Sequence, residues 1–284
     1  MARPSRQVVP AWRRLLAPVE RQLPHGWGDF LLQLSIFAMF DIAYELTRSF
    51  ATGERVAAFH NAYRVVNAER SLHVFHELDV QDWAMRAPGV VLDVANWTYF
   101  NCQFTVTILF LLWVYSRRND SFAFIRNVII TADFIGIIGY LAFPTAPPRM
   151  LGRLGFVDTL DATSVNHHSS LISGLANPYA AMPSLHTAYA VLIGVSGVLL
   201  TRHLWAKALW SLYPALVVFS IVATGNHFIL DAVAGLAVLI VAVALNLLWV
   251  FARRRRTPPP PPRPRRPDRP DRRLGESQPT SVTA

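Results

Sequence analysis

Hydrophobic positions in this chain fall in six long runs that are separated by shorter polar segments. The runs cover about residues 30–50, 94–116, 122–143, 185–201, 204–223 and 228–252. A helix rises about 1.5 Å per residue, so about 20 apolar residues are enough to cross the hydrocarbon layer of a membrane. The pattern therefore predicts an all-α fold, namely a transmembrane helical bundle of six spans.

Residues 54–92 show a mixed pattern of apolar and polar positions. Four apolar residues recur there at the spacing of one helix face: Val56, Phe59, Tyr63 and Val66. Glu69 lies off that face. The spacing predicts amphipathic helices that lie on the membrane surface or cap the bundle. Three histidines also fall in this segment: His60, His73 and His76. They allow a three-histidine metal site, but surface positions are the favoured interpretation.

The composition agrees with a membrane protein. The chain has 284 residues, of which 52% are hydrophobic and 16% are charged, and its mean hydropathy is +0.29. A soluble domain carries about 25% charged residues. The single cysteine, Cys102, excludes an internal disulfide.

Basic residues gather in two tails and in two of the predicted loops. If both tails are cytoplasmic, 20 of the 27 lysines and arginines lie on the cytoplasmic side, in agreement with the positive-inside rule. The sequence thus predicts three regions in a cell membrane. Residues 1–28 form a basic cytoplasmic tail, residues 29–252 a six-span catalytic domain, and residues 253–284 a disordered cytoplasmic tail rich in arginine and proline. The long segment 144–185 is then extracytoplasmic.

The arginines at positions 253–256 directly follow the last apolar run. Such a block favours contact with anionic lipid at the cytoplasmic surface. Nucleic acid is not an expected partner, because no aromatic residues are interleaved with these arginines for base stacking. The sequence leaves the oligomeric state open.

Three motifs lie at the predicted extracytoplasmic ends of the spans. They read FPTAPPR at 143–149, MPSLH at 182–186 and TGNHFILD at 224–231. Proline favours the first turn of a helix, and Ser184 can cap the free amides there. A helix start with free N–H groups suits a phosphate. The motifs therefore predict an anion site at the membrane rim.

The residues of these motifs fit phosphoryl transfer. His227 and Asp231 are four residues apart, which places both on one helix face, so the carboxylate can orient the ring for attack. His186 lies on another helix and can protonate the leaving oxygen. Arg149 can bind two phosphoryl oxygens. A structural histidine–carboxylate pair is the alternative interpretation of His227 and Asp231.

With these motifs the chain resembles the type 2 phosphatidic acid phosphatase superfamily. Its proline-rich first motif and Gly-Asn-His third motif are similar to the branch of inositol-phosphorylceramide synthases, over about residues 30–250. The resemblance implies His227 as the nucleophile that forms a phosphohistidine, Asp231 as its orienting group and His186 as the general acid. It implies phosphate binding by Arg149 and Ser184, and it requires no metal or other cofactor.

The chain also departs from the common phosphatase pattern. Ala142 occupies the position of the motif lysine, Met150 follows the arginine in place of proline, and Ile221 replaces the arginine of the third motif. Three residues are candidates for the missing phosphate-binding positions: Arg153, Arg48 and Asn226. A phosphodiester carries less charge than a monoester, so fewer cations favour a head-group transferase.

We therefore expect an enzyme that cleaves a lipid-linked phosphoester at the extracytoplasmic face and transfers the group to water or to an inositol-like alcohol. A lipid-phosphate transporter or non-catalytic scaffold with the same fold is the alternative. A hydrolase with a metal bound by His186, His227 and Asp231 is a third. Two further features are expected to be structural: an internal Glu45–Arg48 pair, and pairing of Asp133 with another span. His167 and His168 are expected at the loop surface.

Overall fold

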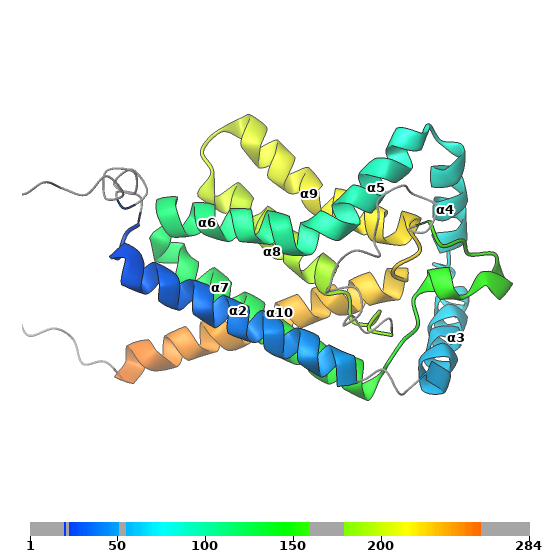
Figure 1. Ribbon diagram of the computed structural model, residues 1–284, viewed down its shortest axis with the longest axis horizontal. Coiled ribbons are helices and arrows are strands. Elements are labelled where there is room, and N and C mark those ends of the chain that lie inside the picture. The colour runs from blue at the N-terminus through cyan, green and yellow to red at the C-terminus, as the bar shows by residue number, and fades with distance from the viewer. Residues whose placement is uncertain (1–19, 21–22, 51–54, 160–178, 257–284) are drawn as a thin grey trace, which may run out of the picture. The chain divides into compact units, whose positions relative to one another are not determined.

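A computed structural model describes residues 20, 23–50, 55–159 and 179–256; side chains in the second half of the first helix are described only in part. The chain divides into two units, residues 1–248 and 249–284. All regular structure in the described residues is helical. The α-helices are α2 (Gly26–Phe50), α3 (Arg55–Ser71), α4 (Glu77–Arg86), α5 (Gly89–Asn101), α6 (Thr107–Arg117), α7 (Asn119–Ala142), α8 (Leu185–Leu200), α9 (Leu204–Ala223) and α10 (Ile229–Arg256) (Figure 1).

Each of the six predicted apolar runs is helical, which confirms the all-α prediction. Within the described residues, four helical segments are long and apolar enough to cross a membrane: 89–117, 119–142, 204–223 and 229–255. The apolar helix α8 has only 16 residues. The first of the four segments joins α5 to α6 through a π-helical turn at Cys102–Val106, which accommodates one widened turn without a break.

Helices α8 and α9 fold back on each other across a three-residue connection. Two glycines of α8 make this close packing possible. A Cβ added at Gly194 would lie 2.6 Å from Cγ of Pro214, and one at Gly197 would lie 2.4 Å from the Trp210 ring. These distances are too short for any side chain, so the contact between the helices depends on glycine at both positions.

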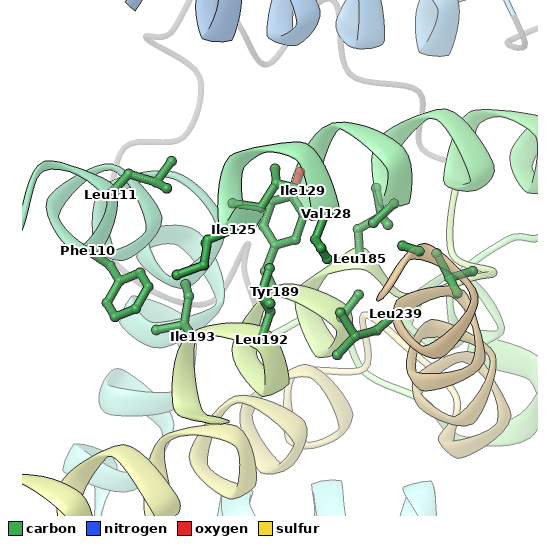
Figure 2. Close-up of a cluster of buried hydrophobic side chains, with 14 of the residues drawn as sticks. Phe110, Leu111, Ile125, Val128, Ile129, Leu185, Tyr189, Leu192, Ile193 and Leu239 are labelled. Atoms are coloured by element: carbon green, nitrogen blue, oxygen red, sulfur yellow. The ribbon is translucent and has the colours of Figure 1, made fainter. Parts of the chain in front are cut away.

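The largest hydrophobic core joins α6, α7, α8 and α10. Figure 2 shows Phe110, Ile125, Leu192 and Leu239 among its side chains, which come from these four helices. Asp133 of α7 accepts a hydrogen bond from the Tyr189 hydroxyl of α8. The predicted pairing of Asp133 with another span is therefore confirmed, and it fixes α7 against the helix that carries His186.

The segment after the first span forms helices α3 and α4, as predicted, but the buried face of α3 differs from the prediction. Val56 is 86% exposed and Tyr63 is also exposed, whereas Ala62, Val66 and Glu69 are buried. Of the predicted face, Val66 is buried and Phe59 packs against the same core, whereas Val56 and Tyr63 do not. Alanines and the acid Glu69 complete the buried face, so it is rotated from the one predicted.

Helices α3 and α4 anchor the long segment between α7 and α8. The Asn61 side chain donates a hydrogen bond to the Pro144 carbonyl at 2.9 Å. Gln81 of α4 donates to the Val157 carbonyl at 3.0 Å and accepts from the Val157 amide at 2.9 Å. At the other end of the segment, the Thr145 amide donates to the Tyr179 carbonyl at 2.8 Å. Figure 1 shows α3, α4 and residues 144–159 of this segment at the same end of unit 1. Polar anchors thus hold the first motif beside the second.

The first and last helices differ in their bounds from the predicted boundaries. Helix α2 begins at Gly26, within the predicted basic tail, and α10 continues to Arg256. The arginines at 253–256 are therefore helical, so α10 extends past the predicted boundary at residue 252; Arg253 lies over the Trp249 ring at 4.8 Å. Of the two predicted tails, residues 1–19, 21–22 and 257–284 lie outside the described residues.

Candidate active site

The second motif forms the start of α8. Ser184 is fully buried and caps the helix, and its hydroxyl accepts the Thr187 amide at 3.4 Å. The sequence had indicated that Pro183 lies in the first helical turn. In the structure Pro183 instead precedes the cap residue. A capped start fixes the direction of the first turn of α8, and His186 lies in that turn, half-buried.

The third motif forms a tight turn between α9 and α10. Gly225 has a φ of +67°, a conformation that favours glycine. A Cβ there would also lie 2.8 Å from the Gln81 side chain and 3.3 Å from Cβ of Arg149. The amides of Asn226 and His227 donate to the Ile221 carbonyl, at 2.9 and 3.0 Å. The turn is thus fixed by α9 on one side and by the first motif on the other.

The two histidines meet, although they belong to different helices and are 41 residues apart. Nε2 of His227 lies 3.2 Å from Nδ1 of His186, and the ring centroids are 5.3 Å apart. The His186 ring also stacks on Tyr99 of α5, with centroids 4.8 Å apart. The structure therefore brings the two imidazoles together, as the sequence predicted.

The partners of His227 determine which of its nitrogens carries the proton. Nδ1 lies 2.8 Å from the Ala181 carbonyl oxygen and 3.4 Å from Oδ2 of Asp231. Both oxygens are acceptors, so Nδ1 is the donor. In the neutral ring, Nε2 then holds the lone pair and accepts from Nδ1–H of His186. The nitrogen that faces His186 is thus the one that carries the lone pair.

Asp231 is fully buried and holds two elements together. Its Oδ2 accepts the Phe228 amide at 2.9 Å, and its carbonyl accepts the Ser184 amide at 2.9 Å. The first contact caps the start of α10, as an acid at the third helical position can. The second bonds α10 directly to the cap residue of α8. One residue therefore orients His227 and joins the two histidine helices.

Arg149, in a 3₁₀ turn at Pro148–Met150, is attached to the same turn as His227. Its amide donates to the Gly225 carbonyl at 2.7 Å, and its Nε donates to Oδ1 of Asn226 at 2.9 Å. Its other guanidinium end pairs with Asp158 at 3.3 Å. The guanidinium is thus fixed through the residue that precedes His227.

The remaining predicted residues are less closely joined to the histidines. Asn226 is buried, and its amide donates to the Thr224 hydroxyl at 2.8 Å while its oxygen accepts from Arg149. Arg153, in the next 3₁₀ turn, is exposed. His60, His73 and His76 are also exposed, in agreement with surface positions. The Arg48 and Glu45 side chains, and both loop histidines at 167 and 168, lie outside the described residues.

The sequence interpretation missed two carboxyl groups at the start of α10. Oε1 of Glu77 accepts the Ile229 amide at 2.8 Å, and Oε1 of Glu69 accepts the Leu230 amide at 2.8 Å. Both glutamates are fully buried. The sequence held one signal for this position: Glu69 recurs at helical spacing after Ala62 and Val66, so it shares the face of α3 that small residues define.

Burial and charge both act on Glu69. Removal from water, followed by the charges of Glu77 and Asp231, raises the pKa of Glu69 to about 9, and its bond to the Leu230 amide opposes this only in part. Glu69 is therefore protonated at neutral pH. Three carboxyl groups bind the start of α10, those of Asp231, Glu77 and Glu69. Because Glu69 is protonated, they carry less negative charge than three carboxylates would.

Gly235, one turn after Asp231, was also missed. A Cβ there would lie 2.0 Å from the Ser184 carbonyl oxygen. No side chain fits at that distance, so glycine allows α10 to approach the start of α8. The signal was a glycine four residues after Asp231, which places it on the same helix face.

Comparison with known proteins gives three matches. A family model described as the PAP2 superfamily matches residues 63–245. A phosphoinositol dihydroceramide synthase of Bacteroides thetaiotaomicron is 27% identical over 172 residues, which are 56% of this chain and 54% of the relative. The chain thus spans about half the length of that relative. The crystal structure of Aquifex aeolicus LpxE aligns at 19% identity with a TM-score of 0.44, over 62% of this chain and 94% of that one.

Proposed function

Because this chain belongs to the PAP2 superfamily of membrane phosphatases and phosphotransferases, we propose that it cleaves a lipid-linked phosphoester through a phosphohistidine on His227. The observation that carries the proposal is the 3.2 Å contact between His227 Nε2 and His186 Nδ1. It places a nucleophilic nitrogen beside an N–H donor, which is the pair that phosphoryl transfer needs.

In the first step, Nε2 of His227 attacks phosphorus and the bond from phosphorus to the leaving oxygen breaks. The incoming phosphoryl group separates the two rings. His186, which is doubly protonated in this proposal, then faces the leaving oxygen with its Nδ1–H, gives it a proton and becomes a neutral ring. Asp231 and the Ala181 carbonyl stabilise the positive charge that develops on His227, because both accept from its Nδ1–H.

In the second step, water or an alcohol attacks the phosphohistidine, and the neutral His186 takes the proton of the attacking hydroxyl. The phosphorus–nitrogen bond breaks and returns the electron pair to Nε2. Water as acceptor makes the protein a lipid phosphatase. An inositol-like alcohol as acceptor makes it a lipid phosphotransferase, which the name of the Bacteroides relative supports.

Positive charge for the phosphoryl oxygens comes from Arg149 in this proposal. Its Nε is engaged by Asn226, and Asp158 holds the other end within reach of the turn. Ser184 and Arg153 are the further predicted contacts. Of these, Ser184 accepts hydrogen bonds at its Oγ from the Thr187 amide and from the Thr187 hydroxyl, both at 3.4 Å, so in this proposal its own O–H donates to a phosphoryl oxygen.

The proposed topology has six spans: α2, α5 with α6, α7, α8, α9 and α10. Both tails are then cytoplasmic, with anionic lipid near their arginines. The ends of α7 and α9 and the starts of α8 and α10 share the extracytoplasmic side with the three motifs. The hydrogen bond from the Ser184 amide to the Asp231 carbonyl supports a common side for the two histidine helices.

The metal-dependent alternative fits the geometry less well. Asp231 lies beside Nδ1 of His227, whereas His186 lies beside Nε2. These two nitrogens point to opposite sides of the ring, so one ion cannot contact all three residues without a large rotation. In the described part of the chain, no group of three or more histidine, cysteine or acidic side chains is arranged to hold a metal.

The test is turnover by the purified protein in lipid nanodiscs with labelled lipid phosphates, with and without inositol. We expect His227→Ala to abolish turnover and His203→Ala, an exposed histidine before α9, to leave it unchanged. A labelled phosphohistidine, stable to alkali and labile to acid, should form in the wild type.

Turnover that survives His227→Ala would refute the mechanism. Binding of lipid phosphate with no turnover of any substrate would favour the transporter or scaffold alternative. Product that forms without inositol and does not change when inositol is added excludes the transferase form.

A further inference from the structure

The start of α10 bears three consecutive backbone amides that each bind a different carboxyl group. The Phe228 amide donates to Asp231, the Ile229 amide to Glu77 and the Leu230 amide to Glu69, all within 2.8–2.9 Å. All three carboxyl groups are fully buried. A helix start leaves its first amides without intrahelical partners, so here three separate elements, α3, α4 and α10 itself, supply them.

These contacts act directly on the reacting ring. His227 is the residue before Phe228, and its ring is oriented by Asp231 in the next turn. A shift of the first turn of α10 relative to α8 would move Nε2 away from His186. The two glutamates are 152 and 161 residues from their amide partners, so they bind this turn to a part of the molecule outside the bundle.

We propose that Glu69 and Glu77 are positioning residues of the reaction: they hold the first turn of α10 so that Nε2 of His227 faces His186. This inference rests on the proposed function, because it assigns the glutamates a role in that same site. Neither glutamate touches the histidines in this role, and both act through the α10 backbone.

The charges on the carboxyl groups determine how firmly Glu69 and Glu77 hold the first turn of α10. The groups that face Glu69 are Glu77 from α4 and Asp231 from α10. Three ionised carboxylates at one buried helix start would repel one another. A proton on Glu69 removes one charge, and its Oε1 still accepts the Leu230 amide. All three amide–carboxyl contacts are therefore present when Glu69 is neutral. Repulsion among the carboxylates weakens them when Glu69 ionises.

The experiment measures kcat and KM across pH for full-length Glu69→Ala, Glu77→Ala, Glu69→Gln and Glu77→Gln in nanodiscs. The control is Asp82→Asn, which removes a half-exposed carboxylate of α4 that pairs with Arg86. We expect both alanine variants to lower kcat by about 10–100-fold with little change in KM, because small displacements of reacting groups have effects of that size. The control should match the wild type.

The glutamine variants separate positioning from simple structural support. Glutamine keeps an oxygen that accepts the same amide, so both should retain most of the wild-type kcat. The wild type should lose kcat as pH rises through about 9, the pKa of Glu69. Glu69→Gln cannot ionise, so that alkaline loss should disappear in this variant alone. Hydrogen exchange at the Ile229 and Leu230 amides should accelerate in the alanine variants.

Two results would overturn the inference. One is a folded alanine variant with wild-type kcat and unchanged amide exchange. The other is an unchanged alkaline loss in Glu69→Gln, which decides the matter even if neither alanine variant folds. Failure of the proposed function is distinguished by His227→Ala. If turnover does not need His227, the proposed function fails; if turnover needs His227 but the folded Glu69→Ala and Glu77→Ala variants behave as the wild type, only the inference fails.

Discussion

At the scale of single residues, hydrogen bonds orient the His227 ring in the candidate site. The Ala181 carbonyl and the Asp231 carboxylate both accept from Nδ1 of His227. This leaves Nε2 as the only nitrogen of that ring with a lone pair to offer. Asp231 also accepts the Phe228 amide, so one carboxyl group determines both the tautomer of the ring and the start of the helix.

Asp231→Asn tests this double role. An asparagine oxygen can still accept the Phe228 amide, so the fold should persist, but the charge that stabilises the His227 imidazolium is lost. We expect kcat to fall by about 10²–10⁴-fold, as for other residues that orient a catalytic histidine, with KM nearly unchanged. Steady-state kinetics measure both values. Asp79→Asn, at an exposed carboxylate of α4, is the control, and equal kcat in the two variants would contradict the assignment.

At the scale of the elements, close helix contact brings the motifs together. Glycines at the crossings of α8 with α9, and of α10 with the start of α8, allow backbone approaches that no side chain permits. Helices α3 and α4 fix the other side, through hydrogen bonds from Asn61 and Gln81 to the segment that carries Arg149. The site is therefore a meeting of helix ends, and its geometry depends on how closely those ends approach.

Gly235→Ala should disturb that approach. The added Cβ would lie 2.0 Å from the Ser184 carbonyl oxygen, which is backbone and cannot rotate away. We expect a loss of about 3 kcal/mol of stability, in the range of overpacked cores, together with a lower kcat. Thermal unfolding in detergent measures the first. Gly28→Ala, at a helical glycine of α2 with open space around it, is the control and should be neutral or slightly stabilising.

At the scale of the whole molecule, the distribution of basic residues and the helix starts imply one orientation in the membrane. The three motifs share one side of unit 1, joined by the bonds from Arg149 to the third motif and from Ser184 to Asp231. In the proposed topology, the connection between α8 and α9, with Arg202 and His203, lies on the opposite side of the membrane.

Labelling of single cysteines in intact cells tests this orientation. In a Cys102→Ser background, a cysteine at Val157, which is 44% exposed, should react with a membrane-impermeant maleimide. A cysteine at exposed His203 should react only after the cells are permeabilised. The reverse pattern would place the site on the cytoplasmic face.

One buried group makes the stability of the whole molecule depend on pH. The pKa of Glu69 is raised from 4.5 to about 9. Between these values the folded protein binds a proton that the unfolded chain has released, so the free energy of unfolding falls as pH rises. The wild type should therefore lose Tm between pH 6 and pH 9, and Glu69→Gln should lose less. Parallel slopes for the two proteins would rule out a proton on folded Glu69.

The sequence by itself determined the helices and the family, and it supplied the candidate site residues. Periodicity and hydrophobic run length are local properties, so 204–223 was placed as a helix with the bounds that α9 has. The three motifs carried His186, His227, Asp231 and Arg149, because their spacing is itself the signal. The face of α3 was assigned wrongly, since burial depends on what packs against a helix and not on its own residues.

Only the tertiary structure decided which distant groups meet. Glu69 and Glu77 bind amides 161 and 152 residues away, and no local pattern gives the partner of a buried acid. The need for glycine at position 235 also depends on a distant residue, because a Cβ there would meet the Ser184 carbonyl oxygen. A local pattern predicts the shape and the chemistry of a segment, whereas the contacts that orient the reacting ring follow from the packing of all the segments together.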